Sequence, residues 1–376
     1  MKGRMPISIV LTLMLTTADF LISSNWQSAA ILSAAESEGS YAPSFIVEAQ
    51  GWVELKREQW SDYHRIDPDD TELYPGDLLR AAPRTRVRIL CADERIFWTP
   101  PADEEAWGIN NFCRPIPATR RSSSAPARGG DEKPGIPYII SPRNTRLLSE
   151  KPVLRWNGIT DVGSYTVSIS DQRANGQVIW ETEVSGTEVV YAGQTPLEPG
   201  VPYLLIVKAD NGSSSQKNKV PGRGFKLIDR NEAEGVRAAA SKIEKELAGE
   251  AEALAIAHIY MERELRAEAI ETLEKLVAKK SQTPGVYRLL GELYSQVGLT
   301  RLAGKRYLKA MELTAPWDVE GKAETQAALA EVYVGLGDTS EAIRYGEAAK
   351  VGYETLGDRA RAGELADKLQ LWRQLN

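Results

Sequence analysis

The sequence predicts a multidomain protein in which two small all-β domains precede an all-α solenoid of helical hairpins. Three observations lead to this prediction. The chain has 376 residues, more than the about 100–150 residues of an ordinary domain. Residues 43–230 consist of short apolar and β-branched runs separated by turn residues, which is typical of strands. Residues 231–376 change to Ala, Glu, Leu, Lys and Arg with helical periodicity and an internal repeat.

Residues 1–35 have the pattern of a secretory signal peptide. Lys2 and Arg4 supply a positive start, an apolar stretch follows, and residues 33–35 (Ser-Ala-Ala) offer a cleavage position. Asp19 interrupts the apolar stretch, so an unbroken span of about 20 apolar residues is not available. We therefore expect export to the periplasm or the extracellular space, with no stable membrane span after cleavage. Retention of the segment as an anchor stays open.

The composition favours a globular protein that does not bind nucleic acid. Hydrophobic residues make up 42% and charged residues 26% of the chain, as in globular proteins. The net charge is −6, and the basic residues are scattered among acidic ones. Nucleic-acid binding requires a basic stripe that releases counterions from phosphates, so we expect no nucleic-acid partner.

Residues 43–117 predict the first β domain. An alternating run occupies residues 51–55, a Pro-Gly-Asp turn follows at 75–77, and residues 86–91 place arginines on one face of a strand and apolar groups on the other. In this order the pattern resembles the periplasmic β domain of FecR-type proteins. The resemblance implies a small β fold and, by analogy, a signalling role in the envelope.

The two cysteines of the chain, Cys91 and Cys113, both lie in this first β region. In an exported domain, a pair that closes a short loop is most simply a disulfide, which stabilises by about 3 kcal/mol through the unfolded state. Two unpaired buried thiols are the alternative. A zinc site needs about four ligands, and the chain adds only two distant histidines. We therefore expect no metal.

Residues 138–230 predict a second β domain, separated from the first by a Ser/Pro/Gly-rich linker at 118–137 that we expect to be flexible. Strand runs alternate here with Asn-Gly turns. The motif at 197–203 (Leu-x-Pro-Gly-x-x-Tyr) resembles the tyrosine corner of a fibronectin type III domain, and Trp156 fits its buried tryptophan. The resemblance implies an Ig/fibronectin III-like sandwich in which the Tyr203 hydroxyl caps the preceding turn, but it implies no ligand.

Residues 231–376 repeat a pattern of small and large residues every 34 residues, and the third copy is displaced by five more. The matching positions of the three copies are Ala257, Tyr260 and Ala269, then Gly291, Tyr294 and Ala303, then Ala330, Tyr333 and Ala342. The pattern resembles the tetratricopeptide repeat (TPR), in which small residues let paired helices approach closely. The displacement predicts an extended first helix near residues 316–318, and residues 359–375 predict a capping helix.

The TPR resemblance implies a partner-binding groove lined by the first helix of each hairpin. Carried over residue by residue, the groove positions are His258, Met261, Glu262, Arg288, Glu292, Gln296, Glu324, Glu331 and Val334. Acidic members outnumber basic ones, so complementarity favours a protein or peptide ligand with basic and apolar residues. Solvated helix faces without a partner are the alternative.

The sequence predicts no enzyme and no cofactor. The only two histidines, His64 and His258, fall in different predicted domains, so they do not suggest a shared catalytic site. No Gly-rich phosphate-binding motif occurs. The acidic run at 67–72 lacks the Gly and Glu positions of an EF-hand, and we expect it to be a solvated turn.

We therefore expect a non-catalytic envelope protein that acts as a scaffold or adaptor through the TPR groove. Two alternatives remain. The β domains could contact cell-wall glycans or another polysaccharide through exposed aromatic side chains, because sugars stack on tryptophan; the candidates are Trp52, Trp60, Trp98 and Trp107. The chain could also be a periplasmic FecR-like signalling component.

Overall fold

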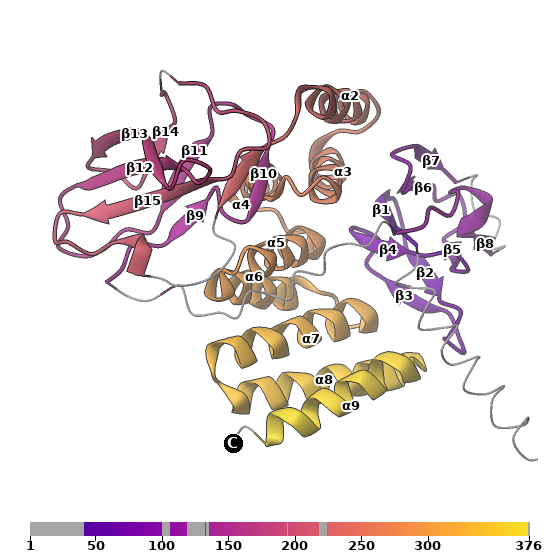
Figure 1. The fold of residues 1–376 in the computed structure, drawn as a ribbon. Coiled ribbons are helices and arrows are strands. Elements are labelled where there is room, and N and C mark those ends of the chain that lie inside the picture. The colour runs from indigo at the N-terminus through magenta and orange to yellow at the C-terminus, as the bar shows by residue number, and fades with distance from the viewer. Residues whose placement is uncertain are drawn as a thin grey trace, which may run out of the picture.

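The computed structural model describes residues 41–99, 106–118, 132, 135–193, 195–217 and 224–374. Figure 1 shows two β domains on either side of a stack of helices. The predicted fold class, N-terminal β domains followed by an all-α solenoid, is therefore confirmed. The predicted signal peptide and most of the predicted linker lie outside the described residues.

The first β domain contains two four-stranded sheets with strand orders β4-β1-β6-β7 and β3-β2-β5-β8. Apolar residues alternate along the strands, so that residues such as Val53 and Leu55 on β2 are fully buried between the sheets. A disulfide joins Cys91 to Cys113, as predicted. The strands are β1 (Ser44–Ala49), β2 (Val53–Lys56), β3 (His64–Ile66), β4 (Thr71–Leu73), β5 (Leu78–Ala81), β6 (Val87–Leu90), β7 (Ile96–Trp98) and β8 (Trp107–Gly108).

The second β domain packs a three-stranded sheet, β14-β11-β9, with a five-stranded sheet, β10-β16-β15-β12-β13. Trp156 on β11 is buried in its core. The hydroxyl of Tyr203 accepts a hydrogen bond at 2.9 Å from the backbone N–H of Glu198, across the turn that precedes β15. The strands are β9 (Ile139–Ser141), β10 (Thr145–Leu147), β11 (Val153–Trp156), β12 (Tyr165–Asp171), β13 (Gln177–Val184), β14 (Glu188–Val190), β15 (Tyr203–Ala209) and β16 (Phe225–Leu227).

The helices form three antiparallel hairpins, α3/α4, α5/α6 and α7/α8, with α2 before them and α9 after them. α7 has 18 residues against 14 in α3, so the first helix of the third hairpin is extended, as the sequence predicts. The helices are α2 (Arg230–Glu246), α3 (Gly249–Glu262), α4 (Arg266–Ala278), α5 (Pro284–Gln296), α6 (Thr300–Leu313), α7 (Val319–Leu336), α8 (Thr339–Leu356) and α9 (Arg359–Arg373).

The small residues of the repeat lie where helices touch. A Cβ atom on Gly291 of α5 would lie 2.6 Å from the ring of Tyr307 on α6, and one on Gly346 of α8 would lie 2.8 Å from the ring of Trp372 on α9. Because neither ring can recede without opening the stack, glycine sets the close helix spacing at both places.

The second β domain is attached to the helices by polar contacts at the β10 side. The Arg143 guanidinium donates from Nε to the carbonyl of Val297 at 2.6 Å, and Arg146 forms an ion pair with Glu232 of α2.

Sequence reasoning did not separate α2 from the repeats. α2 begins after Asp229, whose side chain accepts a hydrogen bond from the backbone N–H of Glu232 and caps the helix.

Glu132, within the predicted linker, is attached to the helices. The Glu132 carboxylate accepts hydrogen bonds from the backbone N–H groups of Arg301 and Leu302, the latter at 3.0 Å, at the start of α6. A carboxylate is favoured there because the first backbone N–H groups of a helix have no partner within the helix. Glu132 is therefore held at the start of α6.

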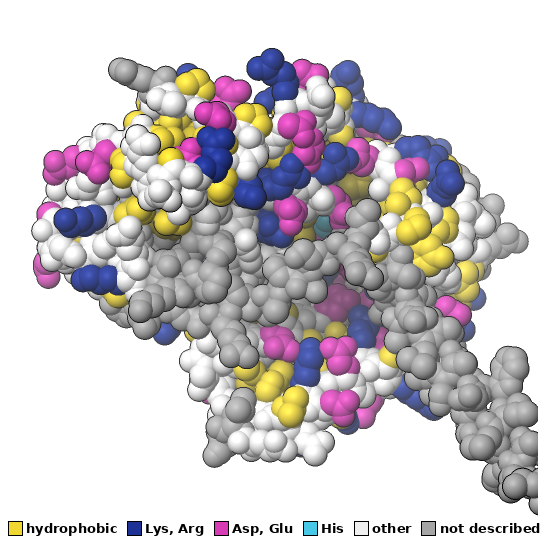
Figure 2. Space-filling view, in the orientation of Figure 1, with side chains coloured by type: hydrophobic (Ala, Val, Ile, Leu, Met, Phe, Trp, Pro, Cys, Tyr) yellow, Lys and Arg dark blue, Asp and Glu magenta, His cyan; other side chains and the backbone are white. Residues whose placement is uncertain are grey.

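Figure 2 shows Lys and Arg side chains interleaved with Asp and Glu side chains on one face of the molecule, with no continuous basic stripe over the atoms that it colours. Within the described ranges, no helix combines enough length with enough apolar residues to cross a membrane.

Candidate protein-binding groove

The turn between β3 and β4 of the first β domain lies against helices α3 and α5. Asp70, at the end of this turn, places a carboxylate oxygen 2.6 Å from Nε2 of His258 on α3. The His258 ring also stacks on Phe45 of β1, with ring centroids 3.5 Å apart. Both side chains of the polar pair are buried, with 4% of His258 and 7% of Asp70 exposed. A predicted groove residue is therefore covered by the protein's own β domain.

The next hairpin touches the same turn. A Cβ atom on Gly285, at the start of α5, would lie 2.5 Å from Cβ of Asp70 and 2.6 Å from the carbonyl oxygen of Asp69. Arg288, one turn further along α5, donates from Nη2 to that carbonyl at 3.4 Å. The turn can approach α5 this closely because residue 285 has no side chain.

Arg57 joins the first β domain to the third hairpin. Its Nε donates to Glu320 of α7 at 2.7 Å, and its Nη1 donates to Asp77 of its own domain at 3.0 Å. All three side chains are at most 5% exposed. Burial alone would lower the pKa of Arg57, but the charges of Glu320 and Asp77 raise it above its usual range. The ion pair therefore stays charged and spans the contact.

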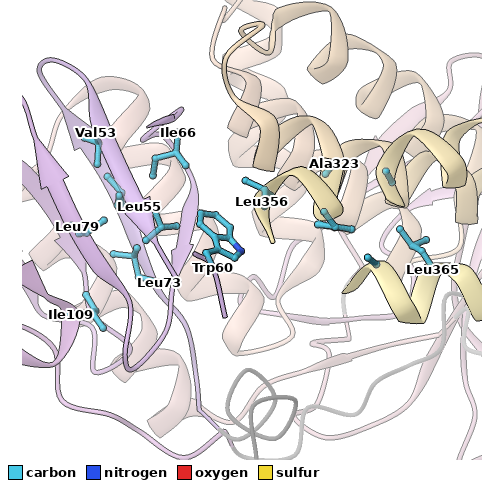
Figure 3. Close-up of a cluster of buried hydrophobic side chains, with 14 of the residues drawn as sticks. Val53, Leu55, Trp60, Ile66, Leu73, Leu79, Ile109, Ala323, Leu356 and Leu365 are labelled. Atoms are coloured by element: carbon cyan, nitrogen blue, oxygen red, sulfur yellow. The ribbon is translucent and has the colours of Figure 1, made fainter. Parts of the chain in front are cut away.

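Apolar side chains continue this contact toward the C-terminal helices. Figure 3 shows Trp60 between the core of the first β domain and Leu356 at the end of α8. Trp60 is 2% exposed and belongs to one hydrophobic cluster with Leu356 and Leu365. At the edge, the Arg65 guanidinium lies 4.2 Å from the centre of the Trp317 ring. The first β domain is thus fixed to the helices by a shared core as well as by ion pairs.

The nine predicted groove residues lie on three different intramolecular surfaces. His258, Met261, Glu262 and Glu292 line cavities next to the first β domain, and Arg288 contacts its turn. The main chain of Gln296 accepts a hydrogen bond from Asn144 of the second β domain. The remaining positions are near α9: Glu324 pairs with Arg361 at 3.1 Å, Glu331 pairs with Lys368 at 3.0 Å, and Val334 packs on the same cluster as Trp60.

One expectation about this region is wrong. The acidic run at 67–72 is not a solvated turn, because Asp70 is buried against His258. On α3 and α5, the polar contacts with this segment come from His258 and Arg288. Gly285 directly follows Pro284 at the start of α5, and a glycine there allows another segment to approach the helix closely. Sequence reasoning did not use this signal.

The Asp69 carboxyl group lies among other carboxylates in this contact. Burial first, and then the charges of Asp67, Glu250, Asp70 and Glu48, raises its pKa to about 7. One of these neighbours, Glu250, belongs to α3. The contact between the turn and the helices therefore disfavours the charged form of Asp69.

We expect the folded protein to become more stable as the pH falls from about 8 to about 5. A carboxyl group whose pKa is raised binds its proton more tightly in the folded state than in the unfolded state, where its pKa is near 3.8. Stability is therefore lost as the pH rises through about 7. Urea midpoints across this range measure the effect. Asp69→Asn is expected to flatten the dependence, whereas Asp62→Asn in the exposed 61–62 segment serves as control; an equal slope in both variants would contradict the assignment.

The aromatic side chains considered for glycan contact do not share one exposed face. Trp60 is buried against the helices. Trp107 is half-buried and packs edge-on against Phe112, with ring centroids 6.4 Å apart. Trp52 is 37% exposed, and the side chain of Trp98 lies outside the described part. The buried position of Trp60 weakens the glycan alternative.

Comparison with known proteins finds similarity in the helical part. No family model and no curated protein matches the chain. Similar solved structures include MamA, with 22% identity over 39% of this chain and 94% of MamA at a TM-score of 0.28. They also include YrrB, described as a TPR protein with an unusual peptide-binding site, with 18% identity over 38% of this chain and 81% of YrrB at 0.28.

A third similar structure is a putative kinesin light chain from Podosopora anserina with nearly identical TPR-like repeats. It shares 19% identity over 38% of this chain and 86% of its own length, with a TM-score of 0.27. Similarity at this level transfers no ligand and no partner to this chain.

Proposed function

We propose that the chain is a non-catalytic scaffold of the cell envelope that holds two β domains in a fixed arrangement and binds protein partners. The observation that carries the proposal is the contact between the helices and the first β domain. Helices α3, α5 and α7 already bind a folded protein surface, through His258, Gly285 and Glu320. A helical stack that binds one folded domain in this way has the chemistry of a protein-docking surface.

The envelope location is supported by the sequence and by the disulfide. The first 35 residues have the composition of an export signal, and Cys91–Cys113 is the kind of bond that persists in oxidising compartments. We assign the first β domain as FecR-like and the second as fibronectin III-like. The sheet order of the second domain and the Tyr203 hydroxyl contact support the second assignment.

In the proposed scaffold, the first β domain and the helices together form surfaces that neither of them has alone. The first β domain covers the α3 and α5 positions, so a partner meets the helices and this domain together. A mutation that separates the first β domain from the helices should therefore abolish partner binding, even though the mutated residue does not contact the partner.

Gly285→Ala is the variant that tests this proposal. Alanine favours a helix by about 1 kcal/mol over glycine, so α5 itself should remain intact, while the new Cβ atom collides with Asp69 and Asp70. Gly363→Ala on α9 is the matched control, because a Cβ atom there meets nothing within 4 Å. The full chain and both variants are crosslinked in envelope fractions, and captured proteins are then retested for direct binding with purified components.

We expect a protein that binds the wild type and Gly363→Ala equally, and binds Gly285→Ala at least about tenfold more weakly. Circular dichroism should show equal helix content in all three. If no captured protein rebinds the purified chain, the scaffold function is wrong. Recovery of glycan in place of protein would favour the wall-binding alternative.

A further inference from the structure

One sheet of the first β domain presents two exposed arginines on its outer face. In this sheet β2 lies between β3 and β5, and Glu54 on β2 is directly opposite Arg65 on β3 and Arg80 on β5. Residues that lie directly opposite one another on neighbouring strands point to the same face. Val53 and Leu55, on either side of Glu54, are buried in the domain core. Glu54 and the two arginines therefore point away from the core.

Each of the two arginines stacks on an aromatic ring instead of pairing with Glu54. The Arg65 guanidinium lies 4.2 Å from the centre of the Trp317 ring, and the Arg80 guanidinium lies 3.8 Å from the centre of the Tyr63 ring. Among the residues that the structure describes, no carboxylate forms an ion pair with Arg65 or Arg80. Stacking holds a guanidinium by its flat face, so the N–H groups at its edge can still donate to a ligand.

This outer face carries more positive than negative charge. Strands β2, β3 and β5 together contain Lys56, Arg65 and Arg80 against a single carboxylate, that of Glu54. The Lys56 ammonium group lies 6.0 Å from the centre of the Tyr63 ring, so two cations share this ring. We call the surface formed by these five residues the arginine face. It is a local positive surface on a chain whose net charge is −6, and it complements a negatively charged ligand.

Carboxylates are the groups that stacked guanidinium ions bind best. The planar fork of an arginine matches both oxygens of a carboxylate. Because the rings of Tyr63 and Trp317 already hold the guanidinium groups in place, binding costs less side-chain entropy. Trp52, two residues before Glu54 and therefore on the same face, is 37% exposed and offers an apolar contact beside the charges.

A protein segment fits the arginine face better than an acidic glycan does. A sugar ring that stacks on an aromatic side chain needs an open ring face. Arg80 covers one face of the Tyr63 ring, and Arg65 covers one face of the Trp317 ring. A peptide needs no such ring face, because its Asp and Glu side chains reach the guanidinium edges directly.

We propose that the arginine face binds an acidic segment of a protein partner, with its carboxylates on Arg65 and Arg80 and an apolar side chain on Trp52. Trp317 belongs to the segment between α6 and α7, so the first β domain and the helical part both contribute to the site. The inference rests on the proposed function, since it takes the partner to be a protein.

The probes are two blocked pentapeptides of equal size that differ in charge. Acetyl-Glu-Glu-Leu-Glu-Glu-amide carries four carboxylates, and acetyl-Gln-Gln-Leu-Gln-Gln-amide carries none. Titration calorimetry at neutral pH and low salt measures their affinities for the full chain. We expect the glutamate peptide to bind at least about tenfold more tightly, and this preference to shrink as NaCl is raised to about 0.5 M.

A double variant tests the two arginines. Arg65→Gln with Arg80→Gln should weaken the glutamate peptide about tenfold, because both guanidinium contacts are lost. Arg155→Gln with Arg173→Gln is the matched control. It changes the net charge equally, but at exposed arginines of the second β domain, and should leave the affinity unchanged.

A third variant has the opposite expected sign, so misfolding cannot imitate its effect. Glu54→Gln removes the carboxylate that lies opposite both arginines, and it should strengthen the glutamate peptide about threefold. Glu181→Gln, at an exposed carboxylate of β13, removes the same charge elsewhere and should change nothing.

Equal affinity for the two pentapeptides, or equal weakening by the two double variants, would overturn the proposal. An oligogalacturonate that binds the arginine face more tightly than the glutamate peptide would replace the protein segment by a glycan. The scaffold function would still stand in these cases if captured proteins continue to depend on Gly285. Conversely, selective binding of the glutamate peptide without any captured protein partner would keep the site and remove the scaffold function.

Discussion

Replacing Arg57 by alanine is expected to lower the free energy of unfolding by about 3–5 kcal/mol, because it removes the buried cation that Asp77 and Glu320 share. The guanidinium is the shared partner of Asp77 in the first β domain and Glu320 on α7. It also lies 5.5 Å from the ring centre of Trp60. Urea unfolding followed by tryptophan fluorescence measures the loss. An early transition of the first β domain, separate from that of the helices, is the expected form of the curve.

Arg155→Ala is the matched control for this prediction. Arg155 pairs with Glu188 on the surface of the second β domain, where the two side chains are 38% and 63% exposed. Exposed pairs contribute at most about 1 kcal/mol. Equal effects of the two alanine substitutions would show that the Arg57 contact does not fix the first β domain to the helices.

Removing the disulfide, by Cys91→Ala with Cys113→Ala, should lower the free energy of unfolding by about 3 kcal/mol. The bond closes a loop with a sequence separation of 22 residues, and opening it restores the conformational freedom of this loop in the unfolded chain. The urea midpoint with and without the double substitution measures the effect. The loss should appear in the transition of the first β domain, because both cysteines lie there.

A reductant provides the control for the disulfide prediction. It should lower the midpoint of the wild type by a similar amount and leave the double variant unchanged. If the reductant leaves the wild type unchanged, the loss in the double variant comes from repacking of the two buried sites rather than from the bond.

The elements of this fold could be predicted where the signal is local. The repeat of small residues identified the helix contacts at Gly291 and Ala303, because close packing tolerates only small side chains there. The displacement of the third copy predicted the longer α7. The strand alternation around residues 86–91 likewise corresponds to β6, whose apolar side chains face inward.

The contacts between domains could not be predicted, because they join residues that are distant in sequence. Arg57 and Glu320 are separated by 263 residues, and neither position stands out by composition. The groove residues were chosen for their place on the helices, but which surface covers a helix depends on the whole chain. His258 therefore looked like a solvated groove residue, although Asp70 and Phe45 bury it.

The shared core of Trp60 and Leu356 imposes an order on folding. The first β domain is synthesised before α7, α8 and α9. Trp60 and Arg57 therefore lack their contacts with Leu356 and Glu320 until about 260–300 further residues have been synthesised. Until then the Trp60 ring lies on the surface of a domain that is otherwise able to form its sheets, and Arg57 has only Asp77 of its own domain as a partner. Synthesis that stops before α7 would leave this apolar surface open to aggregation.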